Sequence, residues 1–479
     1  MGVLPLKSVS GDVGRRAAAH ALNRIGYGPR PGDIDKVLDQ GLGAWIMAQL
    51  RPAGSDPETT SRLSTIPSLN YTTPQILAIY NADNRNLGPI INDFYNAKVI
   101  RAVHAQNQLQ EVMLDFWFNH FNVNINDGFV RYSIMSYERD ALRPRVLGKF
   151  KDLLKAVAEH PAMLFYLDNY LSTVSRVVNN VLIQGLNENY GRELLELHTV
   201  GVDAGYTQAD VFDAARCFTG WGIDNQQTSG QMIFRLANHD RATKSVFGLN
   251  VAANGQKDDG DRVVEYLSTH PATAHFVSEK LARRFVADNP PQSVVSKMAE
   301  TWLDTDGDIA EVLLRMFGST EFWAEEFGEG PGKPKTPLEY VVSAIRAVDG
   351  QVTNANAGVI AYLANMGMPL YQCIPPTGYS FRGDEWVNPS TQLYRMNFAL
   401  DLAAGRVAGV TVDARTLARG ASLSDPRAIA AAFGSAVIGP TLSKQTQETA
   451  GRVDTRVSNP SVAARTVGLL LASPEFQVR

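Results

Sequence analysis

Residues 187–199 read NENYGRELLELHT. The segment combines three glutamates, an arginine and a histidine with three leucines, and it contains no lysine. Side chains three and four positions apart share one face of a helix. The spacing therefore predicts one helix whose polar stripe contains Asn189, Glu193 and Glu196, while the leucines hold its other side against a core. A solvated surface helix usually carries lysine as well, so we interpret this helix as the carrier of a site.

Two further residues of the segment depend on the course of the helix. Glu188 and Arg192 are four positions apart, a spacing that allows an ion pair. His198 follows Glu196 by two positions, so it joins the polar stripe only if the helix bends or ends there.

The rest of the chain is dominated by helical patterns. Strand patterns are almost missing, apart from a possible short strand at residues 231–235. We expect an all-α fold, a large multi-helix domain with long site-bearing loops and at most a minor β-hairpin. A Gly- and Pro-rich stretch at residues 328–335 divides the chain into a main helical domain, residues 13–326, and a C-terminal helical part, residues 336–479, packed on it as one continuous unit.

Composition excludes several classes of protein. The chain has 479 residues and a formal net charge of -4, without the basic stripe that nucleic-acid binding requires. It contains no apolar run of about 18 residues, so we expect no membrane span. Its two cysteines, Cys217 and Cys373, are too few for a disulfide framework. They could form one bridge, but we interpret them as two buried thiols.

Polar and aromatic residues recur in four other segments. Residues 115–123 read DFWFNHFNV and place His120 between two asparagines, Asn119 and Asn122. Residues 218–221 end in Trp221, and residues 238–240 contain His239 and Asp240. Residues 373–386 form a long Pro/Gly loop that ends in Trp386, a type of loop that usually builds a site.

Two acidic motifs have simpler explanations. Thr207 and Asp210 have the spacing of a capping box, so Asp210 is interpreted as a helix cap. Residues 304–308 superficially suggest a calcium loop, but the glycine and glutamate positions of that loop do not match. Asp308 is therefore expected to cap the next helix.

Several of these segments together resemble the large bacterial family called domain of unknown function 1800. The resemblance rests on residues 16–29, 116–121, 187–199, 205–210, 218–221, 239–244 and 270–274 and on the terminal 473–476, and so covers nearly the whole chain. One departure is Gly191, where the family usually has alanine; a glycine there costs about 1 kcal/mol of helix stability.

The resemblance implies an exported protein, periplasmic or secreted, with a possible partner protein from a neighbouring gene. It does not imply a reaction. Residues 1–7 lack the apolar run of a signal peptide, so the expected location rests on the resemblance alone.

The first functional hypothesis is a hydrolase that acts on a glycan or glycoside. Such enzymes use one protonated and one ionised carboxyl group. We expect Glu193 and Glu196 at the centre of the site, with Glu188 or Asp240 as a further catalytic carboxylate. The substrate-binding side chains expected around them supply hydrogen-bond donors and ring faces for sugars: Asn119, His120, Asn189, Arg192, His198, Trp221, His239 and Trp386.

Two alternatives stay open. His120, Glu193, Glu196, His198, His239 and Asp240 are enough ligands for a metal-dependent hydrolase or oxygenase, but their spacing matches no known metal signature, so no metal ligand is assigned and the cofactor is unknown. A non-enzymatic binding or scaffold protein would instead use Glu188, Arg192, Glu193 and His198 as a buried ion network, which needs full pairing to offset desolvation.

Overall fold

The computed structural model describes residues 11–82, 85–178, 181–183, 185–324, 332–438, 442–456 and 461–479. The expected all-α fold is confirmed. The first half of the chain contains helices α1 (Gly11–Ile25), α2 (Asp33–Gln40), α3 (Leu42–Leu50), α4 (Pro57–Leu63), α5 (Thr73–Ala82), α6 (Gly88–His104), α7 (Gln108–His120), α8 (Val130–Ser136), α9 (Phe150–Ala158), α10 (Pro161–Tyr166), α11 (Asn189–Glu193) and α12 (Gln208–Cys217).

The second half continues in the same way. Its helices are α13 (Asp258–Ser268), α14 (Pro271–Phe285), α15 (Gln292–Asp304), α16 (Ile309–Phe317), α17 (Thr320–Trp323), α18 (Pro337–Ala347), α19 (Val359–Asn365), α20 (Pro389–Ala403), α21 (Ala414–Ala418), α22 (Pro426–Phe433), α23 (Lys444–Gly451), α24 (Val462–Leu471) and α25 (Pro474–Gln477). None of the described helices combines the length and the apolarity that a membrane crossing requires.

Strands form four separate two-stranded antiparallel pairs, more than the one minor hairpin expected. Strand β4 falls within residues 231–235, where the sequence predicted a short strand. All the described strands are only two or three residues long, and the others show no alternation of polar and apolar residues that would predict them. The pairs are β1 (Arg176–Val178) with β2 (Val181–Ile183), β3 (Trp221–Ile223) with β4 (Met232–Phe234), β5 (Lys244–Val246) with β6 (Leu249–Val251), and β7 (Gln351–Val352) with β8 (Val410–Thr411).

Local capping fixes where several helices begin. Thr207 and Asp210 form a reciprocal capping box at the start of α12, and the Asp308 carboxylate accepts the backbone N–H of Glu311 at the start of α16. Both acidic residues therefore have the structural roles expected from the sequence. Ser319 and Ser473 cap α17 and α25 in the same way, which accounts for the similar sequences around them.

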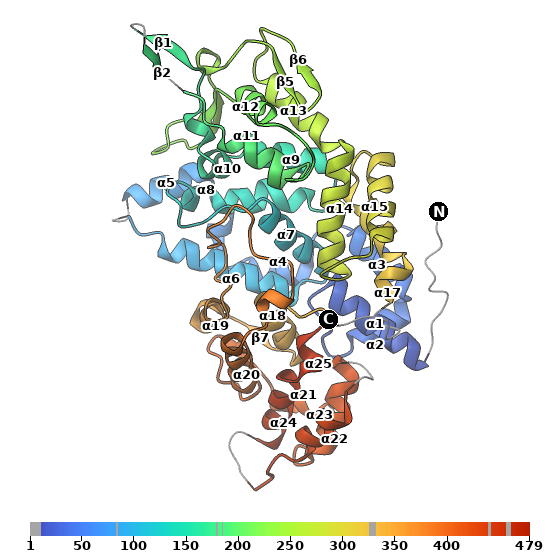
Figure 1. Ribbon diagram of the computed structural model, residues 1–479. Coiled ribbons are helices and arrows are strands. Elements are labelled where there is room, and N and C mark those ends of the chain that lie inside the picture. Colours follow the sequence, from blue (N-terminus) through green and yellow to red (C-terminus); the bar gives the residue numbers. More distant parts are fainter. Residues whose placement is uncertain are drawn as a thin grey trace.

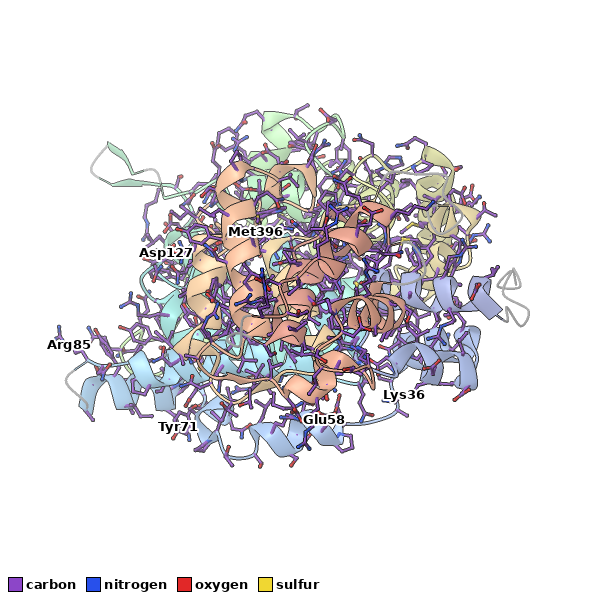
Figure 2. The ribbon with its side chains drawn as sticks, turned by 90° about the horizontal axis from the view of Figure 1, so that it is seen from below. Lys36, Glu58, Tyr71, Arg85, Asp127 and Met396 are labelled. Carbon is purple, nitrogen blue, oxygen red and sulfur yellow. The ribbon has the colours of Figure 1, made fainter. Side chains whose placement is uncertain are left out.

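The helices pack around a continuous core with buried tryptophans at Trp117, Trp221 and Trp302. Both cysteines are buried and free, as expected. In Figure 1, α11, α12 and α13 lie at one end of the molecule, and α20 to α24 lie at the other. Seen from below in Figure 2, α20 lies in front and carries the exposed Met396.

The two expected parts of the chain contact each other directly. Arg346 on α18, which is buried, donates hydrogen bonds to the backbone oxygens of Gly28 (2.7 Å) and Val103 (2.6 Å). Half of the linker expected between them, residues 328–331, lies outside the described residues. The buried guanidinium thus joins residues 336–479 to the N-terminal helices.

Candidate functional site

Helix α11 is short and begins at an asparagine. The Asn187 side-chain oxygen accepts the backbone N–H of Asn189 (2.9 Å), which satisfies one of the free donors at the helix start. Gly191 lies where α11 meets α12: a Cβ there would come within 2.6 Å of the Ala215 backbone nitrogen. Glycine thus allows α11 to lie directly against α12, which explains the departure from alanine.

A π-helical turn, η5 (Leu194–His198), continues α11. Single-turn π segments widen a helix and are frequent at functional sites. Here Glu196 stays half-buried at the surface, whereas His198 is buried. His198 therefore lies apart from the polar stripe, and the helix ends there.

Arg192 is the centre of a partly exposed group of charges. Its guanidinium contacts Glu188 at 2.9 Å and Glu196 at 3.4 Å. It also donates to the Gln208 side-chain oxygen (3.0 Å), and Gln208 in turn donates to Glu188 (2.8 Å). We call Glu188, Arg192, Glu193 and Glu196 the outer cluster. The ion network considered for a scaffold protein included His198, but the structure puts Glu196 in that place.

Glu193 differs from the other carboxylates of the outer cluster. Its side chain is half-buried and has no hydrogen bond or ion pair to any residue that the structure describes. Burial raises the pKa of Glu193 above its usual value; the charge of Glu196 raises it further and Arg192 offsets part of the rise. The arrangement favours a carboxyl group that keeps its proton to higher pH.

Glu196 is held in place from two sides. Besides its ion pair with Arg192, it accepts a hydrogen bond from the Tyr206 hydroxyl. Burial, with the charge of Glu196, raises the pKa of Tyr206 to about 12, so the phenol stays a donor. Adjacent carboxyl groups in different environments are the arrangement from which acid and base roles arise.

Tyr166 connects Glu193 to the long loop. Its hydroxyl donates to the backbone oxygen of Ile374 (2.5 Å), and the charge of Glu193 contributes to a raised pKa of Tyr166, after burial and Cys373. The loop that later reaches Trp386 therefore starts at a contact with Tyr166 on α10.

His120 and His198 form a buried pair of imidazoles behind the outer cluster. The His120 Nε2–H donates to the backbone oxygen of His198 (3.1 Å), and the ring centroids lie 6.3 Å apart. Burial, with the charge of Lys280 on α14, lowers the pKa of His198 to about 3 and places that of His120 well below its usual value. Both rings are therefore neutral supports for η5. Figure 1 shows α7, which ends at His120, beside α14 and below α11.

Asn119 and Trp386 both contact Tyr379 of the long loop. The Asn119 side-chain oxygen accepts the backbone N–H of Tyr379 (3.0 Å), and the Tyr379 and Trp386 rings lie 5.9 Å apart. The loop thus attaches to the end of α7 next to His120. Asn189, also expected here, is half-buried, and its amide is 3.5 Å from the Leu167 backbone oxygen.

The remaining expected site residues lie in a separate region. His239 is buried and contacts Asp259 (3.2 Å), which also accepts from Lys244 (2.7 Å). We call His239, Lys244 and Asp259 the inner cluster. Trp221 is fully buried beside it against Gly260, where a Cβ would lie 2.6 Å from the indole. This burial leaves Trp221 and His239 no surface for a substrate, so the structure does not support their expected binding role.

Asp240 is fixed in an ion pair. Arg216 donates to its two carboxylate oxygens (2.8 and 3.2 Å). Burial alone would raise the pKa of Asp240, but the hydrogen bonds from Arg216 and from the Ala242 N–H outweigh it and lower the pKa. Both Asp240 oxygens are thus held by Arg216 on α12, and we leave Asp240 out of the catalytic pair.

The structure separates the residues considered as metal ligands. His239 belongs to the inner cluster, whereas His120 and His198 lie behind η5. Among the residues that the structure describes, no three His, Cys, Asp or Glu side chains lie close enough together to hold a metal ion.

Four residues at the site were not expected from the sequence: Tyr166, Tyr206, Lys280 and Arg283. Tyr206 belongs to the recognised segment 205–210 and has a signal there. The others lie in helices α10 and α14, where a tyrosine or lysine in an amphipathic pattern looks like any other surface residue. Only the packing of α10 and α14 against the motif segments gives them a role.

The family model described as "Protein of unknown function (DUF1800)" matches residues 20–478. The chain belongs to this family. The match includes both the main helical part and residues 336–478, so the outer cluster and the long loop are both parts of the family's shared region. No curated protein and no solved structure matches the chain. For this DUF1800 protein, the geometry of the outer cluster and the long loop is therefore the basis for any functional role.

Proposed function

We propose that the protein is a hydrolase that acts on a glycan or glycoside, with Glu193 as general acid and Glu196 as its ionised partner. One observation carries the proposal: two neighbouring carboxyl groups lie in opposite environments. Glu193 is half-buried and without a partner, and its pKa is raised, whereas Glu196 is held by Arg192 and Tyr206. Glycosidic bond cleavage requires this division of roles.

The surroundings of the pair support a sugar substrate. The chain from Ile374 to Trp386, which contacts Tyr166 at its start, supplies two half-buried aromatic rings, Tyr379 and Trp386, whose faces can stack on sugar rings. Arg192 and Gln208 supply polar groups at the other edge of the pair. In line with the family resemblance, we place this activity outside the cytoplasm; fractionation of cells that express the natural gene tests that location.

The reaction places one demand on each carboxyl group. Glu193 donates its proton to the oxygen of the leaving sugar, so that bond breaks without expelling an alkoxide. Glu196, as a carboxylate, activates water or attacks the anomeric carbon, and its ion pair with Arg192 orients it. Tyr206 also donates to the Glu196 carboxylate and helps to orient it.

Release of reducing ends from a panel of soluble polysaccharides tests the proposal. Glu193→Gln removes the proton donor and should lower turnover by about 10²- to 10⁴-fold, with a melting temperature within about 2 °C of wild type. Glu300→Gln, an exposed glutamate on α15, is the matched control and should keep full turnover. Equal turnover in Glu193→Gln and Glu300→Gln, or binding of glycans without product release by the wild type, would overturn the proposal.

A further inference from the structure

A pocket of about 510 Å³ lies between α14 and the long loop. Its volume is in the range of small-ligand sites. One wall is helical and carries two cations, Lys280 and Arg283. The other is the loop, with the Thr377 and Ser380 hydroxyl groups, three aromatic rings and the opposite charges of Arg382 and Glu385, which lie 3.8 Å apart. The lining residues are Lys280, Arg283, Thr377, Gly378, Tyr379, Ser380, Phe381, Arg382, Glu385 and Trp386.

The loop wall is preorganised by hydrogen bonds. The Trp386 indole N–H donates to the Ser380 backbone oxygen (3.0 Å), and the Tyr379 hydroxyl donates to the Pro369 backbone oxygen (2.7 Å). Gly378, at φ +71°, lies so close to α7 that a Cβ would come within 2.1 Å of the Asn119 backbone oxygen. The polar ends of both rings are thus occupied, and a ligand meets their apolar faces in a fixed position.

The cations of the pocket differ in their pairing. Arg283 contacts Glu279 (2.6 Å), and Arg382 contacts Asp384 (2.8 Å). Lys280 has no carboxylate partner among the residues that the structure describes; its Nζ lies 5.3 Å from the centroid of the Phe276 ring. Its charge also acts on the two buried imidazoles, His120 and His198. One half-buried ammonium group therefore faces the pocket without a counter-ion.

We infer that the pocket binds a carboxylate of an acidic glycan, with Lys280 as the counter-ion and the Tyr379 and Trp386 rings as the platform for the sugar that carries it. The inference rests on the proposed function, whose substrate class it narrows to uronate-containing chains. Uronate sugars combine a flat apolar face with one carboxylate, the two features that the pocket complements.

The energetics agree with an anionic ligand. Burial, together with the neighbouring Arg283, lowers the pKa of Lys280 to about 7. A carboxylate at Nζ stabilises the protonated amine and removes the cost of holding an unpaired charge there. Charge-assisted hydrogen bonds of this type are about twice as strong as neutral ones.

Calorimetric titration of the full chain with an oligogalacturonate tests the inference without requiring turnover. The matched ligand is the fully methyl-esterified oligomer, which has the same sugars without the charge. We expect the acid form to bind about tenfold or more tightly than the ester. Lys280→Met should remove most of that preference and Lys280→Arg should restore it, because arginine returns the charge. Lys151→Met, an exposed lysine on α9, should bind as wild type does.

Three results would overturn the inference. The first is equal affinity for the acid and ester forms. The second is an undiminished preference in Lys280→Met with wild-type melting behaviour. The third is tight binding of inorganic phosphate without any preference for the oligogalacturonate, which would assign the pocket to free anions. Hydrolysis of neutral glycans without binding of the oligogalacturonate would refute this inference and leave the proposed function intact. Binding of the oligogalacturonate without hydrolysis of any glycan would refute the proposed function and leave the binding site intact.

Discussion

The outer cluster and the inner cluster contain similar chemical groups in opposite states. In the inner cluster, Asp259 accepts from both Lys244 and His239, and all three side chains are at most 1 % exposed. In the outer cluster, Arg192 and Glu188 have side chains 31 % and 38 % exposed, and Glu193 has no partner. The first arrangement pairs its charges through the Asp259 Oδ2 atom and excludes water, although the buried Oδ1 atom accepts no hydrogen bond from the described residues. The second leaves one carboxyl group available.

This difference separates a structural from a functional use of charged motif residues. A buried charge that loses its partner is strongly destabilising, so a sealed cluster is fixed by folding. A half-buried carboxyl group without a partner is mildly unfavourable for folding but free to exchange a proton with a ligand. Asp240 belongs with the first kind, because Arg216 holds both its oxygens.

Asp259→Asn tests the buried inner cluster and should have the largest effect on stability. It leaves the Lys244 ammonium buried without a counter-charge, which should lower the free energy of unfolding by about 3–5 kcal/mol. Urea denaturation measures the loss. The neighbouring Asp258→Asn, whose side chain is 56 % exposed, should change stability by less than about 0.5 kcal/mol. Comparable losses in the two variants would remove the distinction between the clusters.

Glu193→Gln should have a smaller effect of opposite sign. Because the folded pKa of Glu193 lies above its usual 4.5, the folded protein keeps this proton to higher pH than the unfolded chain does. The contribution of Glu193 to the free energy of unfolding therefore falls as the pH rises from 4.5 through the pKa of Glu193 in the folded protein. Above that pKa the glutamine variant should be more stable than wild type by less than about 1 kcal/mol. Below pH 4.5 the two should be equal.

Glu188→Gln provides the contrast to that measurement. It removes the ion pair with Arg192 at 2.9 Å and should lower stability by about 0.3–0.5 kcal/mol. Paired melting curves across pH measure both variants. A destabilised Glu193→Gln above the folded pKa would mean that Glu193 is a paired structural residue after all.

Local sequence signals predicted much of the fold. Helical periodicity predicted the all-α class. The capping roles of Asp210 and Asp308 could also be predicted, because a cap acts on a backbone N–H only three residues away in the sequence. The strand pairs β1–β2, β5–β6 and β7–β8 were not predicted, since two or three residues carry too little periodicity.

The site was predictable only where one segment contained it. The spacing of Glu188 and Arg192 predicted their ion pair, and that of Glu193 and Glu196 predicted a shared helix face; the ion pair between Arg192 and Glu196 was not predicted. The sequence did not predict the π-helical turn, so the burial of His198 is known only from the structure. The sequence also gave no sign that Trp221 is buried whereas Trp386 is half-exposed, because burial of an aromatic depends on distant packing. Lys280 was missed for the same reason: the elements around it come from residues about 100 positions away on the loop.

The titration of the Glu193 carboxyl group tests the central claim most directly. Carbon NMR of protein labelled at the glutamate side-chain carboxyl, with the Glu193 signal identified by its absence in Glu193→Gln, follows that group alone. We predict a midpoint above 4.5, which rises further in Arg192→Met because Arg192 lowers the pKa of Glu193. A midpoint at or below 4.5 that does not change in Arg192→Met would contradict the account, since Glu193 would then be an ordinary ionised carboxylate.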